Sequence, residues 1–283
     1  MPTNIANMKI GDRVVVYNNA GHPQLDGVPT YAECLKGVGF TGHRWISAAD
    51  RIKDLPDDWF PAVMAKAQVK IFQQHAPLVV LDVDSTLIHE EVIELLASHA
   101  GKEREVAEVT ARAMRGEIDF AESLHYRVAT LEGLPVSVLD EVASAATIHD
   151  GAQQLVQAVQ QAGGFVYAVS GGFAHALAPI ATELGLDGFA ANTLEVVNGK
   201  LTGKVTGQII DRAAKAAMLQ HWAEMHRVPL EATVAVGDGA NDLDMIELAG
   251  FGVGFCPKPI VRQHADCIIE VPTHDVLRAV LGL

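Results

Sequence analysis

The chain has 283 residues, 49% of them hydrophobic, and a mean hydropathy of +0.18. Those values are typical of a globular protein with a sizeable core in one or two domains. The chain has 21 Lys and Arg against 35 Asp and Glu, which gives a formal net charge of −14. Such a surface repels nucleic acids and anionic membranes, so neither is expected as a partner.

The first 75 residues contain no set of residues that points to a reaction. MKIGDRVVVYNN (8–19) indicates a strand, Gly and Pro interrupt the segment after it, and the stretch from Trp59 to Gln74 indicates a helix. We interpret 1–75 as a short N-terminal accessory region of unknown role.

Strands and helices alternate from residue 76 to the end. The apolar run that starts at Leu78 predicts a strand covered on both faces, and further strands are predicted at 165–172, 233–237, 251–255 and 266–271. Helices are predicted at 91–99, where Gly101 would end the helix, and at 150–162, 174–184, 213–226 and 242–250. The stretch 194–203 reads as a hairpin with an Asn-Gly turn.

This alternation predicts the α/β class, with a doubly wound, mostly parallel, Rossmann-like sheet over 76–283. The residues between about 91 and 150 are helical and too numerous for one crossover. We therefore expect them to form a small helical cap inserted over one edge of the sheet.

Three predicted strands end in unusual polar residues. Asp82 and Asp84 follow the first strand, Ser170-Gly171-Gly172 ends the second, and Asp238 follows the third, shortly before Asn241 and Asp242. Ligands bind at the carboxyl ends of the strands in sheets of this kind, so these tips should converge on one site.

The residue types at these tips favour phosphoryl chemistry. One carboxylate of the Asp82–Asp84 pair can attack phosphorus, and the other can move the proton. Carboxylates and a phosphate repel each other, so a hard cation such as Mg²⁺ is needed, with Asp238 as a further ligand. The alternative is that the two aspartates only cap the next helix, which is less expected for a DVDST run directly after an apolar strand.

Each of the other candidate site residues could also have a purely structural role. Ser170 and Gly171 could seat an anion or form only a tight turn. Lys215 could hold a phosphoryl group, although a solvated surface lysine is the default interpretation. Spacing alone favours a surface position for Arg127, and Glu91 fits the first turn of a helix.

The chain resembles a known family at these positions. DVDST, SGG, Lys215 and GDGAND occur in the order of the four motifs of the haloacid dehalogenase (HAD) superfamily. The stretches DVDSTLIHEEVIELLA, AMRGEIDFAESLHYRV, VSGGF, LTGKVTG, VAVGDGANDLDMI and FCPKP resemble its phosphoserine phosphatases in particular. The resemblance covers about residues 77–272.

The resemblance implies a role for each matched residue. Asp82 would be the nucleophile and Asp84 the general acid and base. Mg²⁺ would bind Asp82, the backbone carbonyl of Asp84 and Asp238, with Asp242 supporting these ligands. The substrate would contact Ser170, Gly171, Lys215 and Asn241 at its phosphate, Glu91 at its ammonium, Arg127 at its carboxylate, and Met114 and Phe120 along the pocket.

The implied activity is Mg²⁺-dependent hydrolysis of L-phosphoserine, the last step of serine biosynthesis, through an aspartyl-phosphate. The partner would be a small phosphorylated amino acid, and the family also raises the expectation of a homodimer. Two alternatives stay open: another small phosphomonoester as substrate, or transfer of the phosphoryl group to an alcohol such as homoserine. A non-catalytic protein of this fold would be expected to lack Asp82 or Asp84.

The protein is expected to be located in the cytoplasm. Cys34, Cys256 and Cys267 lie far apart and form no CxxC pair, which argues against a disulfide framework or a zinc site. The first residues contain no apolar signal segment, and no apolar run reaches the roughly 20 residues of a membrane span.

Overall fold

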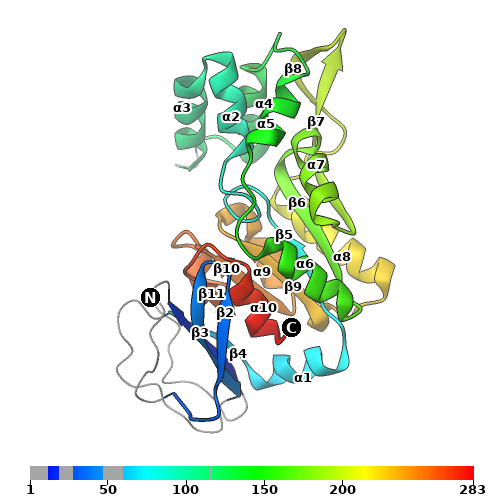
Figure 1. Ribbon diagram of the computed structural model, residues 1–283. Helices are drawn as coiled ribbons and strands as arrows, with labels where there is room; N and C mark the ends of the chain where they lie inside the picture. Colours follow the sequence, from blue (N-terminus) through cyan, green and yellow to red (C-terminus); the bar gives the residue numbers. More distant parts are fainter. Residues whose placement is uncertain (1–11, 19–27, 47–59, 115–116) are drawn as a thin grey trace.

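The computed structural model describes residues 12–18, 28–46, 60–114 and 117–283. A helical cap stands at one end of a large central sheet, and a small antiparallel sheet packs near the other end (Figure 1). Among the described residues, no helix is both long and apolar enough to span a bilayer.

The large sheet has seven strands and confirms the predicted fold class. β5, β6, β7, β9, β10 and β11 run parallel, and β8 pairs antiparallel with β7 to form the predicted hairpin. The strands are, in spatial order, β11 (Cys267–Ile269), β10 (Phe251–Phe255), β9 (Thr233–Gly237), β5 (Leu78–Leu81), β6 (Phe165–Phe173), β7 (Gly188–Val197) and β8 (Lys200–Thr206).

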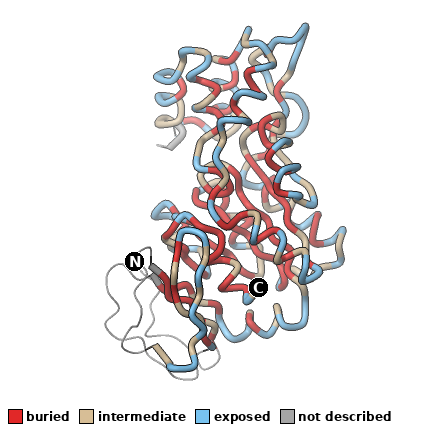
Figure 2. The backbone as a smooth tube through the Cα atoms, in the orientation of Figure 1, coloured by how far each residue is buried: buried red, intermediate tan, exposed pale blue. Residues whose placement is uncertain are grey.

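Helices cover both faces of this sheet because its strands are apolar on both sides. Leu78 and Val80 point toward α8 (Arg212–His226) and α9 (Leu243–Leu248), whereas Val79 and Leu81 point into the core on the other face. That second core includes α6 (Ala152–Gln161), α7 (Ala174–Leu184) and α10 (Asp275–Leu281). Figure 2 shows the resulting band of buried backbone through the middle of the molecule.

The described residues of the cap form four helices, and the helical character predicted between 91 and 150 is confirmed. They are α2 (Val92–Ala100), α3 (Glu103–Met114), α4 (Phe120–Ala129) and α5 (Val138–Ala145). Gly101 ends α2 in the left-handed conformation, with φ +64°. Asp119 caps α4 by accepting a hydrogen bond from the Glu122 backbone N–H.

The small sheet corrects one prediction and adds elements that the sequence analysis missed. The helix expected over 59–74 is wrong in its first half: the described residues there form β4 (Phe60–Met64), and only α1 (Lys66–Gln74) is helical. β1 (Arg13–Asn18) confirms the predicted strand, but β2 (Glu33–Gly37), β3 (Phe40–Ile46) and α10 were not anticipated. The apolar run Phe60–Met64 is too short for its periodicity to distinguish a strand from a helix. It becomes a strand because it pairs with β1.

The small sheet, in the order β2-β3-β1-β4, contributes to two cores. Val15, Tyr17 and Met64 belong to the core that also contains the central sheet. Val14, Val16 and Trp45 form a separate cluster on the opposite face. The small sheet thus packs tightly on the rest of the protein, and a domain boundary near residue 75 stays a prediction.

Candidate active site

The carboxyl ends of four neighbouring strands carry the predicted site. Asp82 follows β5, Asp238 follows β9, and Ser170 lies in β6 where the pairing with β7 loses its register. β10, next to β9, is followed by Lys258. The structure thereby brings together residues that lie up to 176 positions apart in the sequence, between Asp82 and Lys258.

Lys215 lies at the centre of the site and is 1% exposed, so the alternative of a surface lysine is wrong. Its Nζ donates to Asp82 Oδ1 at 2.5 Å and to Asp242 Oδ1 at 2.7 Å. Burial by itself would lower the pKa of Lys215, but the Asp242 and Asp82 carboxylates outweigh burial and raise it. The ammonium is therefore a permanent positive charge beside the proposed nucleophile.

Asp84 is held by two hydrogen bonds. Its Oδ1 accepts from the Val92 backbone N–H at 2.8 Å, and its Oδ2 accepts from the Ser170 hydroxyl at 2.9 Å. The Ser170 oxygen in turn accepts from the Gly172 N–H at 2.7 Å. A Cβ on Gly172 would lie 2.9 Å from both Asp84 Oδ2 and Ser170 Oγ, so the turn needs glycine to approach this closely.

Three buried carboxylates form a cluster suited to a hard cation. Asp82, Asp238 and Asp242 each offer an oxygen, and these oxygens lie within 4.8 Å of one another. Gly237 permits this geometry, because a Cβ there would lie 2.4 Å from Asp242 Cγ. A buried set of carboxylate oxygens at this spacing fits Mg²⁺, whose preferred ligands are oxygens.

The electrostatics of the cluster also favour a cation. Burial raises the pKa of the Asp82 carboxyl well above its ordinary value, Asp242 raises it further, and Lys215 opposes them. Burial likewise raises the pKa of Asp238, against the neighbouring Lys258. Carboxylates outnumber cations in the site: Asp82, Asp84, Glu91, Asp238 and Asp242 against Lys215, Arg127 and Lys258.

The cap places the two predicted charged residues, Glu91 and Arg127, beside Asp84. Glu91 accepts a hydrogen bond from the Ser85 hydroxyl at 3.1 Å, and burial, together with Asp84, raises its pKa to about 7. Burial lowers the pKa of Arg127, while Glu91 and Asp84 act in the opposite direction. Arg127 is half-buried and faces these carboxylates, so it is not the surface arginine that spacing alone favoured.

Phe120, Asn241 and Met114 were also predicted. A Cβ on Gly171 would lie 2.9 Å from Phe120 Cζ, so the cap reaches over the turn that contains Ser170 and Gly171. A Cβ on Gly239 would lie 2.6 Å from Asn241 Oδ1, which places that amide beside the strand tip. Met114 ends α3, and its side chain lies outside the described part of the structure.

Sequence reasoning assigned no role to two residues that contact the site. Lys258 Nζ binds Asp238 Oδ2 at 2.9 Å, and its backbone N–H donates to the Asp238 carbonyl at 2.8 Å. Its position after a parallel strand was a signal that could have identified it. Asn192 is buried and donates to the Gly171 carbonyl at 2.8 Å while accepting from the Ile210 N–H. No local pattern marks Asn192, because only the fold brings β7 to that turn.

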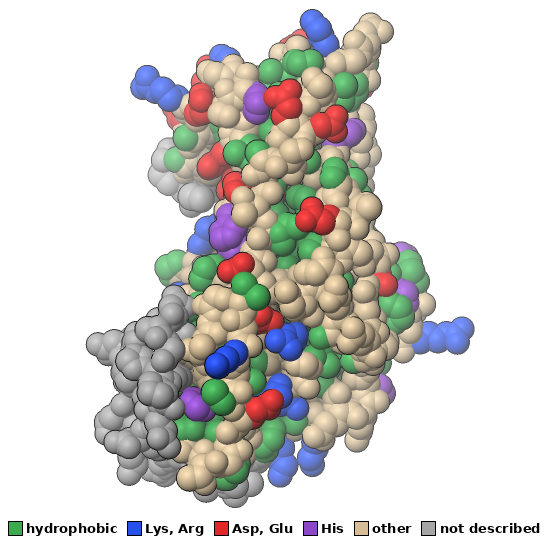
Figure 3. Space-filling view, viewed as in Figure 1, with side chains coloured by type: hydrophobic (Ala, Val, Ile, Leu, Met, Phe, Trp, Pro, Cys, Tyr) green, Lys and Arg blue, Asp and Glu red, His purple; other side chains and the backbone are tan. Residues whose placement is uncertain are grey.

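The outer surface does not supply the positive field that a phosphate requires. The cap segment 91–150 contains twelve acidic and five basic residues, and acidic side chains predominate over the cap in Figure 3. Attraction of an anion must therefore come from Lys215, Arg127, Lys258 and any bound cation at the strand tips.

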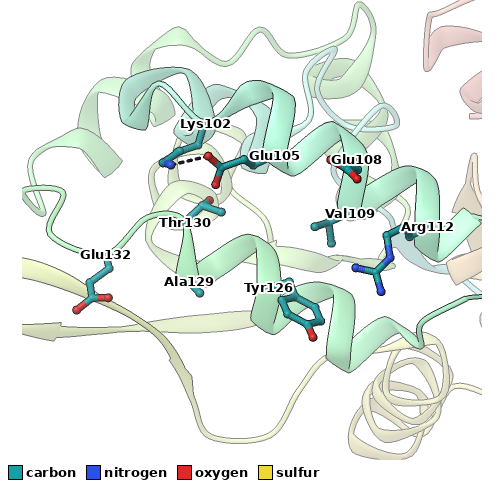
Figure 4. Close-up of a pocket in the computed structure, with 9 residues that line it drawn as sticks. All are labelled: Lys102, Glu105, Glu108, Val109, Arg112, Tyr126, Ala129, Thr130 and Glu132. Atoms are coloured by element: carbon teal, nitrogen blue, oxygen red, sulfur yellow. Dashed lines mark hydrogen bonds and ion pairs between the residues drawn. The ribbon is translucent and has the colours of Figure 1, made fainter.

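A groove of about 620 Å³ lies elsewhere on the cap, between α3 and α4 (Figure 4). Its charged side chains are of both signs, including the Lys102–Glu105 ion pair at 2.5 Å, and Arg112 lies over the Tyr126 ring. None of the predicted site residues lines this groove. The strand tips, and not this groove, hold the catalytic candidates.

Comparison with known proteins agrees with this geometry. The family model of haloacid dehalogenase-like hydrolases matches residues 79–247. A phosphoserine phosphatase of Streptomyces coelicolor is 54% identical over 206 residues, which are 73% of this chain and 50% of that protein. The chain thus spans about half the length of that relative.

Two further similarities cover nearly the whole of the protein compared. A phosphoserine phosphatase of Streptococcus thermophilus is 51% identical over 195 residues, 69% of this chain and 91% of the relative. A solved phosphoserine phosphatase with a phospho-aspartyl intermediate analogue has 41% identity and a TM-score of 0.67, covering 73% of this chain and 97% of that one. With the family model matching more than half of its residues, this chain belongs to the haloacid dehalogenase-like hydrolases.

Proposed function

We propose that this protein is a Mg²⁺-dependent phosphatase that hydrolyses L-phosphoserine to L-serine and phosphate through an aspartyl-phosphate. One observation carries the proposal: the buried Asp82–Lys215 pair and Asp84 face two oppositely charged cap residues, Glu91 and Arg127. Phosphoserine has a phosphate, an ammonium and a carboxylate, so each charged group has a partner of opposite sign in the site. The similar proteins named above carry the same activity in their names.

Asp82 would act as the nucleophile. Lys215 donates to its Oδ1, and within the described part of the chain its Oδ2 receives no hydrogen bond, so that oxygen is available to attack phosphorus. A new O–P bond forms, and the bond from phosphorus to the serine oxygen breaks. The solved relative with a phospho-aspartyl analogue supports a covalent intermediate of this kind.

Asp84 would move the proton in both halves of the reaction. In the first half it protonates the departing serine oxygen, and in the second half it takes a proton from the attacking water. The water oxygen then binds phosphorus, phosphate leaves, and the Asp82 carboxylate is restored. Hydrogen bonds from the Val92 N–H and the Ser170 hydroxyl would orient the Asp84 carboxyl group for both proton transfers.

Asp82, the backbone carbonyl of Asp84 and Asp238 would hold Mg²⁺, with Asp242 in support and itself fixed by Lys215 and the Gly239 N–H. When bound, the ion would offset the negative charge of the phosphoryl group and of the carboxylates. Ser170, Gly171 and Lys215 would bind the phosphoryl oxygens, with Asn241 beside them. Glu91 would bind the substrate ammonium, Arg127 its carboxylate, and Phe120 and Met114 would line the pocket.

The test is phosphate release from a panel of phosphomonoesters, with Mg²⁺ and with EDTA. The panel contains L-phosphoserine, D-phosphoserine, phosphothreonine, phosphoethanolamine and p-nitrophenyl phosphate. We expect Mg²⁺-dependent release with L-phosphoserine strongly preferred. Equal rates on phosphoethanolamine, which has no carboxylate, would contradict the assignment of Arg127. Recovery of a phosphorylated alcohol when homoserine is added would redefine the reaction as transfer.

A further inference from the structure

Two linkers join the cap to the central sheet and run side by side. The outgoing linker is 86–90 and the returning linker is 146–150. The His89 N–H donates to the Thr147 carbonyl at 2.9 Å, and the His149 N–H donates to the Leu87 carbonyl at 3.0 Å. An antiparallel bridge joins Ile88 to Ile148 between them. Any rotation of the cap relative to the sheet must therefore move this pair of linkers together.

His274 binds both linkers. Its ring Nε2 lies 2.9 Å from the Thr86 carbonyl, and its backbone N–H donates to the Asp150 carbonyl at 2.8 Å. Because a carbonyl only accepts, Nε2 must carry the hydrogen. The ring is fully buried and stacks on Phe255, with centroids 4.5 Å apart and an angle of 10° between planes. His274 therefore fixes the point where both linkers leave the sheet.

The turn between β2 and β3 of the small sheet holds the residues on either side of His274. The Val38 N–H donates to Asp275 Oδ2 at 2.8 Å, and the Thr273 hydroxyl donates to the Val38 carbonyl at 2.7 Å. Gly39 adopts φ +79°, and a Cβ there would lie 3.2 Å from Asp150 Oδ2. The turn thus lies directly against the end of the returning linker.

The small sheet is itself attached firmly to α10, which begins at Asp275. Arg13 donates to the Val280 carbonyl at 2.9 Å, and Arg44 donates to the Ala279 carbonyl at 3.1 Å. These cations satisfy carbonyls at the carboxyl end of the helix, where positive charge is favoured. A continuous chain of hydrogen-bonded contacts therefore runs from the small sheet through α10 and His274 to both linkers.

We propose that the β2–β3 turn is a positioning element for the cap: through Thr273, His274 and Asp275 it fixes the linkers, and so aligns Glu91 and Arg127 with the nucleophile. This assigns a role in substrate binding to the small N-terminal sheet. The inference rests on the proposed function, since it concerns the substrate of that site.

The sharpest test is Val38→Pro. Gly39 at positive φ follows Val38 in a two-residue turn, a pattern in which proline is favoured at the first position, so the turn itself should tolerate the change. Proline replaces the N–H that binds Asp275 with a ring carbon, so it removes this hydrogen bond and also displaces the Asp275 carboxylate, while Val38 itself is 43% exposed. Val38→Ala is the matched control because it keeps the N–H.

We expect the KM for L-phosphoserine to rise about 10-fold in Val38→Pro, in line with the loss of one hydrogen bond to a charged group. The kcat/KM for p-nitrophenyl phosphate, which needs neither Glu91 nor Arg127, should change less than about 3-fold, and Val38→Ala should match the wild type. His274→Leu should likewise raise the KM for L-phosphoserine and leave the kcat/KM for p-nitrophenyl phosphate nearly unchanged. His274→Gln keeps a hydrogen-bond donor at similar reach, so its KM for L-phosphoserine should return most of the way to the wild-type value.

Hydrogen exchange supplies a readout that does not depend on activity. The amides of His89 and His149 should exchange about 10-fold faster in Val38→Pro than in Val38→Ala. Unchanged exchange together with unchanged KM would overturn the inference, and so would equal losses on both substrates. A wild-type protein without activity on L-phosphoserine would refute the proposed function instead, while the exchange experiment would still test the positioning role.

Discussion

Replacing Lys215 with methionine tests the electrostatic core of the site. Lys215 makes two charge-assisted hydrogen bonds, of 2.5 and 2.7 Å, to carboxylates that are almost completely buried. Each such bond contributes about 1.5–3 kcal/mol, and breaking a buried ion pair costs about 3–5 kcal/mol. Methionine fills a similar volume, so the expected loss of unfolding free energy at pH 8 is about 3–5 kcal/mol.

The loss should depend on pH in a defined direction. Without Lys215, nothing opposes the effect of burial and of the Asp242 carboxylate on Asp82, so the pKa of Asp82 rises further and the folded protein binds more protons than the unfolded chain. A group whose pKa is raised on folding in this way makes stability fall as pH rises above the unfolded value near 4. The deficit of Lys215→Met relative to wild type should therefore be smaller at pH 5 than at pH 8.

The assay is urea denaturation at both pH values, with EDTA and with excess Mg²⁺. Mg²⁺ should recover part of the loss, because a cation that binds only the folded state stabilises it. Lys204→Met, at an exposed lysine, is the control and should change the unfolding free energy by less than about 0.5 kcal/mol. A deficit below about 1 kcal/mol at both pH values would refute the electrostatic reasoning.

Three further predictions follow from the same contacts. Asp82→Asn should keep the fold, measured by circular dichroism, and lower phosphate release at least about 10⁴-fold, since it removes the proposed nucleophile; ordinary turnover would contradict the assignment. Arg127→Ala should lower kcat/KM for L-phosphoserine about 10- to 100-fold and that for p-nitrophenyl phosphate less than about 3-fold; equal losses would exclude a carboxylate contact. Burial lowers the pKa values of His149 and His274 to about 4, so the unfolded chain binds more protons between pH 6.5 and 4. As the pH is lowered from 6.5 to 4, the unfolding free energy should fall by up to about 3 kcal/mol through the fully buried His274 and by less through His149, and His274→Gln should flatten the decline.

Much of the fold could be predicted from the sequence because its signals are local. The apolar strands that start at Leu78 and Thr233 and the Asn198-Gly199 turn need no distant partner to be recognised. Asp82, the proposed nucleophile, stood out in the sequence for a similar reason. Two carboxylates directly after a buried strand have few plausible roles. The order of the four motifs along the chain reduced those roles further, because it matches one known family.

Tertiary structure decided the features that depend on distant partners. Phe60–Met64 became a strand only because β1 offers a hydrogen-bonding edge, and Lys215 became a buried cation only because the fold places Asp82 and Asp242 around it. The β2–β3 turn gives no sign in sequence that it binds Asp275, 237 residues later. Local pattern fixes which backbone conformation a segment prefers. The packed core determines which distant segments come into contact, and so which partner a buried charge or hydrogen-bond donor finds. No residue near such a group in the sequence identifies its partner.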